Sequence, residues 1–320
     1  MSQIKALLEN IKKTFIKHRV AYFFVLPSVV AMLLMHFSPL MQGIYMSFTK
    51  LDLYNFSKYL KAPFVGLDNY YAALFDTSSP VRLGLLAAVR NTIIYAIVVT
   101  FGTTAIGLGV ALLLNREFKG RAIVRTLFLF PWIVPSFVVG ILWGFMWQKS
   151  NGIINIILYD WLHFPGQKPF WLIGPATMIA IILPTIWRGW PVSMLLLLAG
   201  LQGIPKDYYE AAEIDGANSW QQFKHITLPL LRPVWAIIIL FGLIFNVYSF
   251  NIVIMMFGNG AGFPGEWGDL MMTNIFRNAF LSWDFGTGAA VSVLLMAAMM
   301  ACVSLWYRFY QKIEEDSRGG

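Results

Sequence analysis

The polar side chains of greatest chemical interest lie inside long apolar stretches of the sequence. Arg188 is near the middle of one stretch, where a charged side chain costs about 2.5–3.5 kcal/mol if the stretch crosses a bilayer. Its guanidinium could bind an anionic ligand. Alternatively, a polar cavity, another subunit, or backbone carbonyls left free by Pro184 or Pro191 could hold it in a purely structural role. The sequence leaves both roles open.

A second polar group occurs in the segment Phe245-Asn-Val-Tyr-Ser-Phe-Asn251. Asn246 and Ser249 are three residues apart and therefore share one face of a helix, which Phe245 borders. Amides and hydroxyls beside aromatic rings are typical of a sugar site, because the rings pack on C–H faces while the amides bond hydroxyl groups. The same side chains could instead join neighbouring helices by hydrogen bonds worth about 0.6–2 kcal/mol each.

The sequence offers no candidate residues for bond-making chemistry. Its four histidines, His18, His36, His163 and His225, have no metal-ligand spacing, and Cys302 is the only cysteine, so no intrachain disulfide can form. A GxxxxGK[ST] phosphate-binding loop does not occur. We therefore expect no enzyme activity, no metal and no cofactor in this chain. Any ATP that drives it must bind to another protein.

Composition places these residues in a membrane. The chain is 58% hydrophobic and 12% charged, with a mean hydropathy of +0.64, which excludes a soluble globular domain. The net charge of +8 comes from basic residues at the ends of apolar runs, so we expect contact with membrane lipid and none with nucleic acid. Six runs are long enough to span ~30 Å of hydrocarbon. They cover about residues 20–45, 91–114, 126–147, 173–198, 229–257 and 286–310.

The distribution of basic residues predicts the orientation. Of the 24 Lys and Arg, fifteen fall on the side of the N-terminus when Arg232 and Arg308 are counted with the adjacent loops, and eight fall on the opposite side. The positive-inside rule then places both termini in the cytoplasm. Residues 1–19 are expected to form an amphipathic segment on the cytoplasmic membrane surface. Residues 20–310 would form the transmembrane domain, and 311–320 a cytoplasmic tail.

The loop between spans four and five, residues 201–229, contains EAAEIDGANSWQQFKHITLP. It resembles the EAA loop of ABC importer permeases, whose pattern is Glu-Ala-Ala, three residues, Gly, nine residues and Ile-x-Leu-Pro. The resemblance implies a coupling helix that docks on a separate ATPase, whereas an ordinary amphipathic loop helix is the alternative. The matching positions are Glu210, Ala211, Ala212, Gly216, Ile226, Leu228 and Pro229.

The resemblance extends to nearly the whole chain. Segments 64–70, 130–136, 198–202 and 280–286 are similar to those of the first permease subunit of maltose-type (oligosaccharide) ABC importers. This implies an all-α integral membrane protein with six transmembrane helices of the type I ABC importer permease fold and a cytoplasmic coupling (EAA) helix. The expected location is the bacterial cytoplasmic (inner) membrane. The expected partners are a second homologous permease, an ATP-binding cassette ATPase dimer that holds ATP and Mg, and a soluble substrate-binding protein.

The same resemblance implies a set of substrate-binding positions on spans three, four and five. Arg188 replaces an apolar residue of the maltose-type pattern and Ser249 replaces an amide, which disfavours maltose. A cation would favour an acidic sugar such as a uronate oligomer, or a phosphorylated polyol. The full set is Trp132, Ser136, Thr185, Arg188, Gly189, Phe245, Asn246 and Ser249.

Three other functions compete with a sugar permease. An ABC permease for another solute, such as glycerol phosphate, an amino acid, phosphate or a metal, would share the coupling loop. An ion-coupled secondary transporter should carry carboxylates within its spans, and the six expected spans contain no Asp or Glu. A membrane-embedded enzyme should show a catalytic cluster at one interface, and the sequence shows none.

Overall fold

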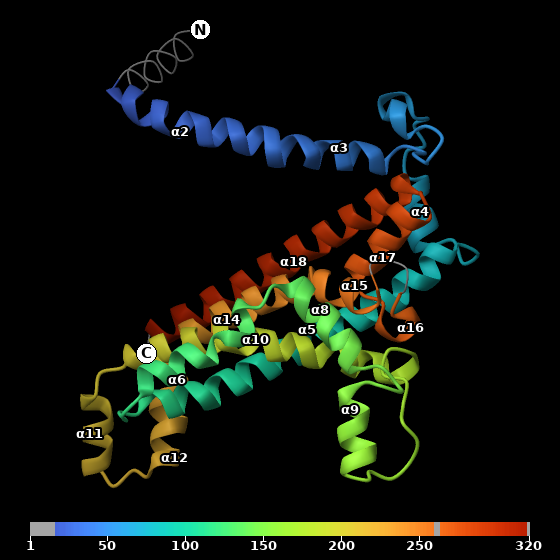
Figure 1. The fold of residues 1–320 in the computed structure, drawn as a ribbon. Coiled ribbons are helices and arrows are strands. Elements are labelled where there is room, and N and C mark those ends of the chain that lie inside the picture. The colour runs from blue at the N-terminus through green and yellow to red at the C-terminus, as the bar shows by residue number, and fades with distance from the viewer. Residues whose placement is uncertain (1–16, 259–262, 319–320) are drawn as a thin grey trace.

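The computed structural model describes residues 17–258 and 263–318, most of which are helical (Figure 1). Four helical segments are long and apolar enough to cross a membrane: Arg19–Ser47, Val81–Asn115, Gly174–Gln202 and Phe285–Lys312. Two bent pairs complete six if each pair is one span: Arg121–Ile133 with Ser136–Met146, bent by 82°, and Ser219–Leu230 with Arg232–Val247, bent by 64°. Each expected span therefore has a helical counterpart among the described residues.

The elements follow one another in a simple order along the chain. They are α2 (Arg19–Met32), η1 (Leu33–Phe37), α3 (Ser38–Ser47), η2 (Phe56–Lys61), α4 (Asp68–Leu74), α5 (Pro80–Asn115), α6 (Arg121–Phe128), α7 (Phe130–Ile133), α8 (Ser136–Met146), α9 (Ile153–Asn155), η3 (Ile156–Trp161), η4 (Gly174–Ala176), α10 (Thr177–Gln202), α11 (Asp207–Ile214), α12 (Ser219–Gln222), η5 (Phe223–Thr227), α13 (Leu228–Leu230), α14 (Arg232–Val247), α15 (Asn251–Met256), α16 (Gly265–Gly268), α17 (Met271–Phe276), η6 (Arg277–Leu281) and α18 (Phe285–Arg318).

Helices α5 and α10 form the centre of the bundle and pack against each other. A Cβ atom on Gly107 of α5 would lie 2.8 Å from the backbone nitrogen of Met194 on α10, so only glycine permits this approach. One apolar core joins these helices to α8 and α15 through buried residues that include Tyr95, Ile181 and Val253. A second core joins them to α14. Together α5 and α10 form a fixed frame for the two broken spans.

Both broken spans are interrupted within their apolar segments. The break between α7 and α8 lies at Val134–Pro135, where proline removes a backbone donor. Span five bends at Leu231 and is interrupted again between α14 and α15, where the sequence contains no proline. By contrast, α10 is one continuous helix through Pro184 and Pro191. Proline therefore accounts for the break in span three but not for the break between α14 and α15.

The first half of span one, helix α2, stands apart from the bundle, whereas the second half, α3, packs against α18. None of the residues of α2 is buried, and the helix extends away from the other spans (Figure 1). Residues 1–16 of the expected amphipathic segment lie outside the described residues. At the other terminus, α18 continues to Arg318 and so runs through most of the expected tail. The C-terminal end of α18 and helices α11 and α12 share one end of the bundle (Figure 1).

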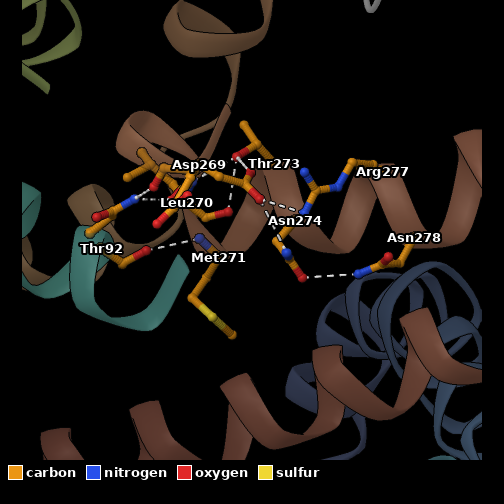
Figure 2. A network of polar contacts seen from close by, with 10 residues as sticks. Thr92, Asp269, Leu270, Met271, Thr273, Asn274, Arg277 and Asn278 are labelled. Carbon is orange, nitrogen blue, oxygen red and sulfur yellow. Dashed lines mark hydrogen bonds and ion pairs between the residues drawn. The ribbon is translucent and has the colours of Figure 1, made fainter. Parts of the chain in front are cut away.

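A buried polar network fixes the segment that connects span five with α18 (Figure 2). The Asp269 carboxylate pairs with Arg277 at 2.8 Å and accepts hydrogen bonds from Thr273 at 2.6 Å and Asn274 at 3.1 Å. On α5, Thr92 Oγ1 accepts a hydrogen bond from the backbone N–H of Met271 at 2.8 Å. Burial raises the pKa of the Asp269 carboxyl, and its three donors act against that shift. The network ties α16 and α17 to α5.

Candidate functional site

A cavity of about 620 Å³ lies where the two broken spans meet α5 and α10. Its volume is in the range of small-molecule sites, about 300–1,000 Å³. Irregular backbone at membrane depth is tolerated where it lines protein or a water-filled cavity, and both breaks contribute here. The structure brings all eight expected substrate residues to its wall: Trp132, Ser136, Thr185, Arg188, Gly189, Phe245, Asn246 and Ser249.

Arg188 supplies the positive charge of this cavity. Its Nε donates a hydrogen bond to the carbonyl oxygen of Val134 at 3.1 Å, so the break in span three anchors the side chain. The sequence left open whether a carbonyl freed by Pro184 or Pro191 would hold this side chain, and the acceptor lies instead on another span, at the break after α7. Among the described residues, neither terminal guanidinium nitrogen has a protein partner, and no carboxylate lines the cavity. The guanidinium can therefore bind an anion from the cavity.

The opposite wall comes from the broken fifth span. Phe245 is 68% exposed, and its ring stacks on Phe241 at a centroid distance of 5.7 Å. Asn246 donates from Nδ2 to Thr100 Oγ1 of α5 at 3.0 Å, which fixes the amide. Within residues 17–258 and 263–318, its amide oxygen and second N–H have no protein partner. Asn251 at the start of α15 lies 3.5 Å from Ser136 at the start of α8. The aromatic rings and amides of α14 and α15 thus line the same cavity.

Tyr95 is a residue that sequence reasoning missed. It is 0% exposed on α5, and its hydroxyl lies 2.7 Å from Thr185 Oγ1 and 3.0 Å from Ser249 Oγ. It therefore joins α10 to the break in span five behind the cavity wall. A tyrosine in an apolar run has the same pattern as any core aromatic residue. The sequence carries no signal that distinguishes it.

The expected coupling loop, residues 201–229, forms a separate feature at the end of the bundle where α18 ends (Figure 1). Gly216 follows α11 with a φ of 78°, a left-handed conformation that commonly ends a helix and that glycine adopts without strain. Asn218 and Gln221 then form a capping box that begins α12. Ile214 is 88% exposed, and Trp220, whose ring centroid lies 5.5 Å from that of Phe223, is 69% exposed, so the loop presents apolar surface.

The seven expected coupling residues are divided between elements of this loop. Three of them, Ala212, Gly216 and Ile226, line one hollow of about 310 Å³. Glu210 and Ala211 lie on α11 outside this hollow, and Leu228 and Pro229 lie in α13, where the chain returns to the bundle. The loop is thus a pair of short helices joined by a glycine turn.

Comparison with known proteins agrees with this architecture. Residues 103–314 match the family described as "Binding-protein-dependent transport system inner membrane component". The chain is 33% identical to the inner membrane ABC transporter permease protein YcjO of Escherichia coli, over 83% of this chain and 86% of the relative. It is also 33% identical to the trehalose/maltose transport system permease protein MalF of Thermococcus litoralis, over 88% and 90% of the two chains.

A solved structure shares the fold. It is a bacterial ABC transporter involved in the import of the acidic polysaccharide alginate, with a TM-score of 0.79 at 21% identity. The match covers 95% of this chain and 99% of the other. It confirms the six-span permease architecture and the helical fold class expected from the sequence.

Proposed function

The chain belongs to the family of binding-protein-dependent transport system inner membrane components, and we propose that it is the permease subunit of an ATP-driven oligosaccharide importer. The observation that carries this proposal is the cavity at the breaks of two spans, lined by aromatic rings, amides and hydroxyls. Such a lining suits a saccharide, and the similarity to a trehalose/maltose permease supports the same class of cargo. Among the described residues, no carboxylate on the cavity wall could couple transport to an ion gradient.

The conformational change that drives transport would be transmitted from the ATPases through α11 and α12. We propose that these helices dock on a dimer of ATP-binding cassette ATPases, which hold ATP and Mg. Their exposed Ile214 and Trp220 would be covered at that contact. Closure of the ATPases would shift the broken spans between inward-facing and outward-facing states. Because α11, α12 and the end of α18 share one side, the C-terminus would be cytoplasmic, in agreement with the distribution of Lys and Arg.

A second, distinct permease would complete the membrane unit. Helix α2 has no buried residue, and it stands clear of the bundle that the rest of the chain forms. Transmembrane helices associate by close packing, so the exposed apolar side chains of α2 would pack on a separate subunit. A soluble substrate-binding protein would deliver cargo to the opposite face.

Arg188 favours an anionic cargo. A guanidinium that has free terminal nitrogens, with no carboxylate among the described cavity residues, is suited to a carboxylate or a phosphate. The first turn of α8, which begins at Ser136, adds the positive end of a helix dipole. We therefore place uronate oligomers first among cargoes and phosphorylated polyols second.

The test is ATP hydrolysis by the complete importer reconstituted with its binding protein. The probes are maltotriose, a tri-uronate and glycerol 3-phosphate. We expect the tri-uronate to stimulate hydrolysis most strongly. Stimulation by maltotriose alone would retain the sugar importer and contradict the anionic cargo. If no saccharide stimulates hydrolysis, the proposed function is wrong.

A further inference from the structure

The hydroxyl groups of Tyr95, Thr185 and Ser249 form a hydrogen-bond chain whose direction is fixed. Thr185 donates its one hydroxyl proton to the carbonyl oxygen of Ile181 at 2.9 Å. Its contact with Tyr95 at 2.7 Å must therefore be donated by Tyr95. Because the tyrosine proton is then used, Ser249 must donate in its contact with Tyr95 at 3.0 Å. The chain runs from Ser249 through Tyr95 and Thr185 to the backbone.

This direction determines what the cavity wall offers to a ligand. Thr185 and Ser249 line the cavity, and each has used its proton inside the protein. Their oxygens keep lone pairs, so both present acceptors and no donors. Tyr95 is 0% exposed and acts only through these two groups. Arg188, on the same helix as Thr185, presents donors and no acceptor.

We propose that Tyr95 is a positioning residue that holds Thr185 and Ser249 as acceptors for the hydroxyl groups of a saccharide. The inference rests on the proposed function, and it states which partner donates in each hydrogen bond between the cavity wall and the saccharide. Saccharide hydroxyls donate to the Thr185–Ser249 wall, while an anionic or acceptor group meets Arg188. A ligand whose hydroxyl groups are methylated has no proton for this wall and is rejected.

The Tyr95→Phe variant tests the proposal because it keeps the buried ring and removes the hydroxyl group. The Ser249 proton is then free to turn into the cavity, where it competes with ligand donors. We expect the KM for uptake of maltotriose or the tri-uronate to rise about tenfold while the maximal rate stays within about twofold. In a Ser249→Ala background, Tyr95→Phe should raise the KM by less than it does in the wild type, because only its contact with Thr185 remains to be lost.

Tyr70→Phe is the matched control, because it removes another tyrosine–serine contact, with Ser47 at 2.6 Å, away from the cavity. Its KM should be unchanged. If Tyr95→Phe lowers the melting temperature of the solubilised complex, Ser249→Ala and Thr185→Val test the acceptors directly, and each must raise the KM. An unchanged KM, or an additive double variant, overturns the proposal. Wild-type protein that imports neither trisaccharide would instead contradict the proposed function, and this inference with it.

Discussion

Arg188 lines the cavity, and its two terminal nitrogens have no partner among the residues that the structure describes, while its Nε donates to the carbonyl of Val134 on another span. The side chain is therefore fixed in place without being neutralised. Inside a membrane this arrangement is costly unless the charge has a use, because an unpaired cation at this depth lacks the hydration it has in water. Binding an anion from the cavity would provide that use.

Replacing Arg188 with Gln should separate charged from neutral cargo. Gln retains a donor for the Val134 carbonyl and loses the positive charge. We expect the apparent affinity for a tri-uronate to fall about 10–100-fold, as for the loss of a charge-assisted hydrogen bond, with maltotriose little changed. The apparent affinity of Arg188→Lys for the tri-uronate should lie between those of the wild type and Arg188→Gln, because an ammonium keeps the charge but lacks the planar set of donors of a guanidinium. Ligand-stimulated ATP hydrolysis measures both, and an equal loss for the two trisaccharides would show that Arg188 is structural.

The Asp269–Arg277 pair gives a second prediction, with a defined pH dependence. The Asp269 side chain is 3% exposed and that of Arg277 is 31% exposed (Figure 2). Arg277→Ala leaves a buried carboxylate without its cation and should cost roughly 2–4 kcal/mol, below the full value for a buried pair because Arg277 is partly solvated. The apparent melting temperature of the solubilised protein measures this.

Because burial already raises the pKa of Asp269, the loss of Arg277 raises it further. A carboxyl with a raised folded-state pKa destabilises the protein when it is ionised, and the penalty shrinks as the pH falls toward the unfolded value. The deficit of Arg277→Ala should therefore be smaller at pH 5 than at pH 8. Lys168→Ala, which breaks the more exposed pair with Asp160, is the control and should change stability little. A deficit that grows on acidification would contradict this account.

Some site residues could be predicted from sequence and others could not. Arg188, Asn246 and Ser249 were predictable because a polar group in an apolar run is conspicuous, and the family motifs added the rest. Tyr95 and Thr100 were not, because a buried hydroxyl on α5 resembles ordinary core and acts through residues 90 to 154 positions away in the chain. Such contacts exist only after the spans have packed.

Helices differ in how well their sequence determines their shape. The break at Pro135 follows from a missing backbone donor, whereas the break between α14 and α15 contains no proline. There, Ser249 bonds to Tyr95, a contact with another span that local sequence does not encode. The coupling loop was predictable almost residue by residue because Gly216 and the Asn218–Gln221 capping box are local signals. Local sequence thus determines where the helices of the loop end, whereas contacts between spans hold the break between α14 and α15.

The turn after α11 yields a prediction about coupling. Gly216 has a φ of 78°, which proline cannot adopt because its ring fixes φ near −65°. Gly216→Pro should therefore displace α12 from α11 and weaken association with the ATPase, and Glu210→Ala should weaken it less. Co-purification of the ATPase and ATP-driven uptake measure the effect. Gly109→Ala, whose added Cβ meets nothing within 4 Å, is the control. Normal association and uptake by both loop variants would remove the docking role.

The cavity and the coupling loop lie in different parts of the molecule. The cavity lies at the breaks of spans three and five, and the coupling loop lies at the end of the bundle beside the C-terminus. Span five connects them directly, because α12, η5 and α13 lead into α14, whose residues Phe241, Phe245 and Asn246 line the cavity. A displacement of the loop can therefore reach the cavity through a single broken helix.

ATP-dependent uptake into proteoliposomes by the complete importer tests this connection most directly. Val192→Trp on α10 places a large ring in the cavity, and Ile179→Trp places the same ring on an exposed part of the same helix outside it. The account predicts that wild-type protein and Ile179→Trp import the tri-uronate only when ATP is present, and that Val192→Trp does not import it. Uptake by Val192→Trp at the wild-type rate, or uptake by any form without ATP, would contradict it.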